Sequence, residues 1–126
     1  MKDRVIAQIQ EVAAKYPAIQ KVVLFGSRAR QDHTPQSDYD IAVFTCNMNF
    51  IRQSRFLEDI DNIPTLNKFD VVFIKDRHID TELYQNILSD GVIIMDKFQI
   101  KLNNYKNALT RLHESINDAK KYDNLT

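Results

Sequence analysis

The chain has 126 residues, a formal net charge of zero and 44% hydrophobic residues. This length fits one small domain with an adequate core, and the composition excludes a disordered chain. Zero net charge argues against nonspecific nucleic-acid binding through bulk charge, and a single cysteine excludes an intrachain disulfide. Because no apolar run has the pattern of a secretion signal or the length of a membrane span, we expect a cytoplasmic protein that binds no membrane.

Helical and strand-like patterns alternate along residues 1–96. An apolar stripe over residues 3–16 predicts a helix that Pro17 ends. Four apolar or alternating runs predict strands at Lys21–Phe25, Tyr39–Thr45, Phe69–Ile74 and Val92–Met95. Three further helices are predicted from Ser27 to about Asp32, over Asn49–Asn62 and over Asp80–Ser89. This order predicts an α/β (or α+β) domain with a small, mixed, four-stranded sheet flanked by helices.

The patterns also predict which residues are buried. The third strand is almost wholly apolar, which favours a central position in the sheet. Asp80 is a candidate N-cap of the helix after it, and Gly91 a stop signal. The inward-facing residues predicted for the second and third of the long helices are Ile51, Phe56, Leu57 and Ile60, and Leu83, Tyr84, Ile87 and Leu88.

Residues 97–126 form a distinct segment. Its apolar positions are spaced alternately four and three residues apart: Phe98, Leu102, Tyr105, Leu109, Leu112, Ile116 and Ala119. This 3.5-residue repeat is typical of a helix that packs along another helix, and about 24 residues would extend about 36 Å. Six Lys/Arg against three acidic residues give the segment a net charge of +3. Two interpretations stay open: the helix packs on its own domain, or it contacts a partner or a second copy in a homo-oligomer.

The most informative motif is Gly26-Ser27 followed ten residues later by Asp38-Tyr39-Asp40, within GSRARQDHTPQSDYD. A glycine beside a hydroxyl residue at the end of a buried strand lets the backbone approach a phosphate. Two aspartates at i and i+2 of a strand point to the same face, where their oxygens suit Mg²⁺. The pattern therefore predicts phosphoryl or nucleotidyl transfer. The alternative is a helix N-cap at Ser27 and a solvated acidic turn.

Three nearby residues are candidates for further roles. Asp70 opens the third strand, where its carboxylate can join the metal ligands and accept the proton of an attacking hydroxyl. Its alternative is an ordinary aspartate at a strand start. Arg28 and Arg30 either pair with phosphate or face solvent.

These residues resemble the signature of the DNA polymerase β-like nucleotidyltransferases, in particular the minimal nucleotidyltransferase (MNT) proteins. That family commonly reads GSRARG, a short loop and SDxDLxV, and this chain reads GSRARQ, DHTPQ and SDYDIAV. The resemblance covers residues 1–96 and implies the polymerase β-like fold, ATP as substrate and two Mg²⁺ ions. It implies metal and catalytic roles for Asp38, Asp40 and Asp70, and phosphate binding by Gly26 and Ser27. The chain departs from the pattern at residue 31, where glutamine replaces the usual glycine.

MNT proteins are typically paired with helical HEPN toxins, on which they adenylylate a tyrosine as antitoxins. The resemblance thus implies AMP transfer to a HEPN-type partner, and KLNNYKNALTRLHESI is similar to the opening helix of such a partner. One alternative is nucleotidyl transfer to a small molecule such as an aminoglycoside. Another is a binding antitoxin without catalytic activity.

Overall fold

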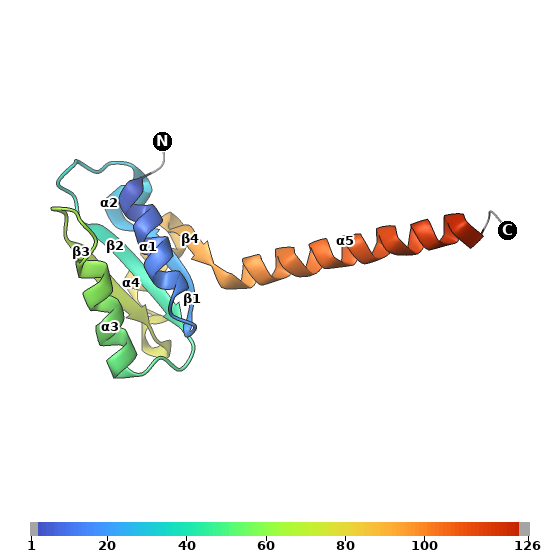
Figure 1. The fold of residues 1–126 in the computed structure, drawn as a ribbon. Coiled ribbons are helices and arrows are strands. Elements are labelled where there is room, and N and C mark those ends of the chain that lie inside the picture. Colours follow the sequence, from blue (N-terminus) through green and yellow to red (C-terminus); the bar gives the residue numbers. More distant parts are fainter. Residues whose placement is uncertain (1–2, 124–126) are drawn as a thin grey trace. The chain divides into compact units, whose positions relative to one another are not determined.

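The computed structural model describes residues 3–123 and contains the helices and strands in the predicted order (Figure 1). The helices are α1 (Arg4–Ala14), α2 (Gly26–Arg30), α3 (Phe50–Asp61), α4 (Glu82–Asp90) and α5 (Lys97–Asp123). The strands are β1 (Ile19–Phe25), β2 (Tyr39–Thr45), β3 (Phe69–Ile74) and β4 (Val92–Asp96). A 3₁₀ turn at Asp76–His78 was not predicted. The chain up to Asp96 forms one compact unit, and the chain from Lys97 onward forms a second.

The four strands form one mixed sheet in the order β3-β2-β1-β4. Strand β1 pairs antiparallel with β2 and β4, and β2 pairs parallel with β3. The predicted mixed sheet is therefore confirmed, but β3 lies at an edge, so its predicted central position is wrong. The strand is apolar because helices cover both faces of the sheet: Phe69 and Phe73 pack on one core, and Val72 and Ile74 on the other.

Two cores lie on opposite faces of the sheet. The larger is formed with α1 and α3, and its fully buried members include Ile9, Val22, Ile41 and Phe56. The smaller core contains Val23, Ala42 and Ile87 and lies beneath α4. Figure 1 shows α1 and α3 in front of the sheet and α4 behind it. Because side chains alternate along each strand, residues of β2 with even numbers face the α4 side.

The helices of the domain bury narrower stripes than the sequence predicts. Phe56 and Ile60 are buried in α3, but Ile51 and Leu57 are 66% and 38% exposed. In α4, Ile87 is buried and Leu88 is 60% exposed. The predicted burial of Ile51, Leu57 and Leu88 is therefore wrong, because each helix contacts the sheet through a single row of side chains.

The start and end of α4 also differ from the prediction. Thr81 caps the helix by accepting a hydrogen bond from the backbone N–H of Tyr84 at 3.2 Å, so the predicted cap at Asp80 is wrong. Gly91 does follow the helix, but its φ of −65° suits any residue. A Cβ at Gly91 would lie 2.1 Å from the Ile87 carbonyl oxygen and 2.6 Å from Val23 Cγ1. Close packing against the last turn of α4 and against β1, rather than a left-handed turn, therefore explains this glycine.

The long C-terminal helix is confirmed as α5, which has 27 residues. Its apolar seam is defined here as Phe98, Leu102, Tyr105, Leu109, Leu112 and Ile116; the side chain of Ala119 lies outside the described part of the chain. Leu109, Leu112 and Ile116 are 47%, 58% and 46% exposed. Of the helices between residues 3 and 123, none has an apolar stretch sufficient to cross a bilayer.

Gln31 ends α2 in the left-handed conformation, with φ 65° and ψ 25°. This conformation costs a residue with a Cβ roughly 1–2 kcal/mol, which explains why glycine is the usual residue at such a helix end. We expect Gln31→Gly to raise the free energy of unfolding by about 0.5–1 kcal/mol in urea titrations, after the entropy cost of glycine is subtracted. Gln36→Gly is the control, because only Gln31 and Asn47 have positive φ among the non-glycine residues 3–123. If Gln31→Gly is less stable than wild type, the left-handed conformation of Gln31 does not carry the expected strain.

Candidate active site

The sheet register places two of the predicted aspartates side by side. Asp40 pairs with Phe25 on β1 and, on its other side, with Asp70 on β3. Both aspartates have even numbers and follow the alternation of Ala42 and Val72, which pack beneath α4. The parallel pairing of β2 and β3 therefore brings Asp40 and Asp70 to the same face and the same end of the sheet.

Asp38 lies two residues before Asp40, at the exposed entrance to β2. The charge of Asp38 acts on Asp40. Burial makes the largest contribution to the raised pKa of Asp40, followed by the charges of Asp70 and then Asp38. Arg30 opposes this shift. Asp70 and Asp38 thus both disfavour the charged form of Asp40, and a cation bound beside Asp40 would stabilise that form.

Gly26 forms the wall of the site on the β1 side. Its φ is +72°, and a Cβ at this position would lie 2.3 Å from Oδ2 of Asp40. The glycine is therefore required both by backbone conformation and by its close approach to the central aspartate. Ser27 follows in the first turn of α2, where no side chain caps the helix. The structure therefore brings Gly26, Ser27, Asp38, Asp40 and Asp70 to one end of the sheet.

The two arginines have different surroundings. The Arg30 side chain is 47% exposed, forms ion pairs with Asp32 at 3.1 Å and Asp90 at 3.9 Å, and acts electrostatically on Asp40. The Arg28 side chain is only 9% exposed. Its guanidinium carbon lies 3.9 Å from the centre of the Tyr39 ring. Arg30 thus pairs with Asp32 and Asp90 and lowers the pKa of Asp40 through its charge, whereas Arg28 is enclosed by protein groups.

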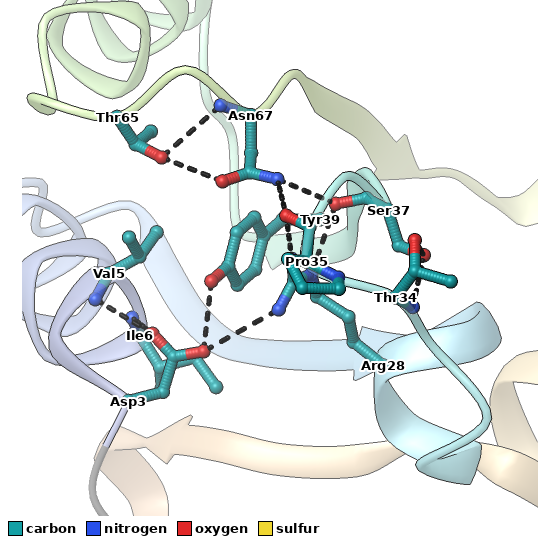
Figure 2. Close-up of polar contacts among 10 residues, drawn as sticks. All are labelled: Asp3, Val5, Ile6, Arg28, Thr34, Pro35, Ser37, Tyr39, Thr65 and Asn67. Carbon is teal, nitrogen blue, oxygen red and sulfur yellow. Dashed lines mark hydrogen bonds and ion pairs between the residues drawn. The ribbon is translucent and has the colours of Figure 1, made fainter.

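A polar network around Arg28 was missed by the sequence analysis (Figure 2). Tyr39 donates a hydrogen bond to Oδ2 of Asp3 at 2.9 Å, and burial together with this bond raises the pKa of Tyr39 to about 12. Asn67 donates hydrogen bonds to the carbonyl oxygens of Pro35 and Ser37. An N-cap pattern at Asp3 was recognisable in the sequence, but nothing in it marked Asn67, which lies far from residues 35–37 along the chain.

The donor chemistry of the site fits a divalent cation. Asp38, Asp40 and Asp70 offer carboxylate oxygens, which Mg²⁺ prefers, and the charges of Asp70 and Asp38 around Asp40 favour bound positive charge. Within residues 3–123, no group of three or more His, Cys, Asp or Glu side chains is close enough to hold a metal by itself. Mg²⁺ usually completes its octahedron with water and substrate phosphate oxygens, so such a site does not require a closed protein cage.

Residues 7–100 match the protein family described as polymerase beta, nucleotidyltransferase. This range spans most of the chain and includes every residue of the candidate site. The chain belongs to the polymerase beta nucleotidyltransferase family. It is therefore a nucleotidyltransferase with the polymerase β-like fold, as the sequence motif predicted. No curated protein matched the sequence.

Three of the solved structures with a similar fold are of toxin–antitoxin complexes. One, a toxin–antitoxin with AMP-PNP, has a TM-score of 0.59 and 21% identity, covering 90% of this chain and 95% of that chain. A second, an MNT antitoxin with a tri-AMPylated HEPN toxin from Shewanella oneidensis, has a TM-score of 0.54 and 19% identity, covering 91% and 95%. A third, the MntA–HepT complex, has a TM-score of 0.54 and 20% identity, covering 90% and 94%.

Proposed function

We propose that this nucleotidyltransferase transfers AMP from ATP to a tyrosine hydroxyl of a HEPN-type helical protein and acts as its antitoxin. The proposal depends above all on the register of the sheet, which pairs Asp40 with Asp70 on β3 and with Phe25, the last residue of β1 before Gly26. The fold shared with antitoxin complexes, one of them holding AMP-PNP and another an AMPylated toxin, supports the choice of nucleotide and acceptor.

Asp38, Asp40 and Asp70 would hold two Mg²⁺ ions together with phosphate oxygens of ATP. When bound, these ions neutralise the charge that develops on the phosphates during transfer. The backbone at Gly26 and the hydroxyl of Ser27 would bind the β- and γ-phosphates. Arg30 is the arginine suited to assist them, because it is exposed and lies within electrostatic range of Asp40.

The transfer itself forms one bond and breaks one. The tyrosine oxygen of the partner attacks the α-phosphorus of ATP, the bond between the α-phosphorus and the bridging oxygen breaks, and pyrophosphate leaves. The proton of the tyrosine hydroxyl passes to the Asp70 carboxylate and from there to solvent. Asp70 is exposed at the edge strand β3, where an acceptor on another protein can approach it.

Asp70→Asn should lower turnover by about 10²–10⁴-fold while the affinity for ATP changes much less, because general-base catalysis is lost and two aspartates remain. Single-turnover kinetics and calorimetric titration of the same variant separate the two quantities. If turnover is normal at normal affinity, Asp70 is an ordinary aspartate at the start of a strand.

The apolar seam of α5 is the proposed contact with the partner. A second copy of the chain fits it poorly, because the positions that flank the seam carry Lys101 and Lys106 and no acidic residue between residues 98 and 113. Parallel or antiparallel pairing of two α5 helices would bring lysines together or leave them opposite neutral residues. A helix with apolar a and d positions and acidic flanks complements the seam better, which favours a different protein.

A chain that ends at Asp96 should keep ATP binding and lose at least about 100-fold in affinity for the helical partner. The same loss is expected for full-length Leu109→Asp/Leu112→Asp. Two apolar side chains that would be buried against the partner in the proposed complex would be replaced by charges. Asn104→Asp/Asn107→Asp, at two positions of α5 outside the seam, is the control with the same two added charges. Light scattering and calorimetry measure both associations; unchanged affinity in the double variant would assign α5 to another role.

The acceptor is tested by incubating the full chain with ATP, Mg²⁺ and the product of its neighbouring gene, as the candidate HEPN-type partner. We expect the partner to gain the mass of one or more AMP groups, with the modification on tyrosine in peptide maps. Transfer to an aminoglycoside but not to the partner would support the small-molecule alternative. Neutralisation of the partner by an Asp38→Asn/Asp40→Asn chain without any transfer would support the non-catalytic alternative.

A further inference from the structure

Two side chains from different parts of the domain hold the same two carbonyl groups of the loop before β2 (Figure 2). Asn67 Nδ2 donates to the carbonyl oxygen of Pro35 at 2.7 Å and to that of Ser37 at 3.2 Å. Arg28 donates from Nε to the Ser37 carbonyl at 3.1 Å and from Nη2 to the Pro35 carbonyl at 3.4 Å. We call these four hydrogen bonds, from Asn67 and Arg28 to the Pro35 and Ser37 carbonyls, the loop clamp. The Ser37 carbonyl belongs to the peptide that joins Ser37 to Asp38, so the clamp holds the backbone on the N-terminal side of Asp38.

The Asn67 half of the clamp is itself held in one orientation. Thr65 Oγ1 donates to Asn67 Oδ1 at 2.9 Å and accepts from the Asn67 backbone N–H at 3.2 Å. Because the amide oxygen faces the threonine hydroxyl, the amide nitrogen faces the loop carbonyls. Asn67 lies two residues before β3, so the strand that carries Asp70 also helps to position Asp38.

The Arg28 half is held from the other side. Its guanidinium lies over the Tyr39 ring, and Nη1 is 3.9 Å from Oδ2 of Asp3. Asp3 also accepts the Tyr39 hydroxyl and, through Oδ1, the Val5 backbone N–H at 2.8 Å. The N-cap of α1 thus anchors Arg28. These contacts occupy the guanidinium and leave the phosphate role to Arg30.

We propose that Asn67 and Arg28 are positioning residues for the metal ligand Asp38. The inference rests on the proposed function, in which Asp38 binds Mg²⁺. Asp38 is exposed and precedes β2. The sheet holds only its C-terminal side, where the Tyr39 backbone N–H donates to the Lys68 carbonyl oxygen at 2.9 Å, so its N-terminal side depends on the bonds to the Ser37 carbonyl. A metal ligand must be held close to its productive position, and loss of an outer-shell partner typically costs about 10–100-fold in metal affinity or activity.

The test compares Asn67→Ala, Asn67→Asp and Arg28→Lys with wild type in the full-length protein. We expect Asn67→Ala to raise the Mg²⁺ concentration for half-maximal AMP transfer about 10-fold or more, with much of the rate restored at saturating Mg²⁺. Asn67→Asp keeps the size of the side chain but replaces the donor nitrogen with an oxygen that cannot donate to the carbonyls. Its Mg²⁺ requirement should therefore be raised at least as much as that of Asn67→Ala. Arg28→Lys loses the planar guanidinium that donates to both carbonyls, and it should also raise the Mg²⁺ concentration for half-maximal transfer. Asn86→Ala, on the exposed face of α4, is the control.

Hydrogen exchange of the metal-free protein gives a second measurement that does not depend on activity. In Asn67→Ala, amides in peptides covering residues 34–40 should exchange faster, while residues 41–44 keep wild-type protection. A wild-type Mg²⁺ curve for Asn67→Ala, or faster exchange throughout β2, would overturn the positioning role. Asp38→Asn in the same transfer assay separates the two proposals: normal transfer there removes the proposed function, whereas its loss beside a normal Asn67→Ala curve removes only the clamp.

Discussion

Asp40→Asn and Asp38→Asn should each lower AMP transfer by at least about 100-fold. Each removes one carboxylate charge from a site whose metal ions stabilise the transition state by several kcal/mol, and each 1.36 kcal/mol is tenfold in rate. Single-turnover assays across a Mg²⁺ titration measure the loss. Asp61→Asn, which removes the same charge from the exposed end of α3, should transfer normally. A near wild-type rate for either site variant at saturating Mg²⁺ would contradict the metal assignment.

The same Asp40→Asn variant should be more stable than wild type at neutral pH without Mg²⁺. The pKa of Asp40 is raised by burial and by Asp70 and Asp38, so its stabilising contribution is fully present below the ordinary pKa of 3.8. That contribution is lost as the pH rises through the higher folded-state pKa. Asparagine is neutral at every pH, so the variant keeps this stabilising contribution at neutral pH. Melting curves should therefore separate above about pH 4 and converge below it, and Mg²⁺ should stabilise wild type but not the variant.

Gly26→Val should be as damaging to activity, through a different cause. The new Cβ would lie 2.3 Å from Asp40 Oδ2, so the central carboxylate must move, and the φ of +72° adds strain of roughly 1–2 kcal/mol. We expect loss of at least about 100-fold in transfer and weaker ATP binding, measured by single turnover and calorimetry.

A control is needed because a strained glycine variant can also lose stability. Gly91→Ala crowds the Ile87 carbonyl and Val23 rather than Asp40. It should lower the melting temperature while its folded fraction keeps the wild-type Mg²⁺ dependence. If Gly26→Val bound ATP as tightly as wild type, the assignment of Gly26 to the phosphate and metal site would be wrong.

The core of the site was predictable because it depends on local geometry. The spacing of Asp38 and Asp40 predicted two carboxylates close together at the start of a strand, and the glycine after β1 is one of only two in the chain. The order of helices and strands followed from apolar periodicity. Strand order did not: β3 is apolar because both of its faces are covered, and this pattern carries no information about how many strands flank it.

The roles of the arginines could not be separated from the sequence. Arg28 and Arg30 are two residues apart in GSRAR, and only the folded loop shows that Arg28 is enclosed by Tyr39, Pro35 and Ser37. The role of Asn67 could not be predicted from the sequence for a related reason. It lies about thirty positions from the carbonyls it binds, and a contact at that separation leaves no periodic pattern in one sequence.

The central claim is transfer of AMP rather than of phosphate, and the position of a label in ATP tests it most directly. The full chain is incubated with Mg²⁺, the helical partner, and ATP labelled either at the α-phosphate or at the γ-phosphate. We expect the α-label to become attached to the partner and the γ-label to be released in pyrophosphate. Attachment of the γ-label, or of neither label by a chain that binds ATP and the partner, would contradict it.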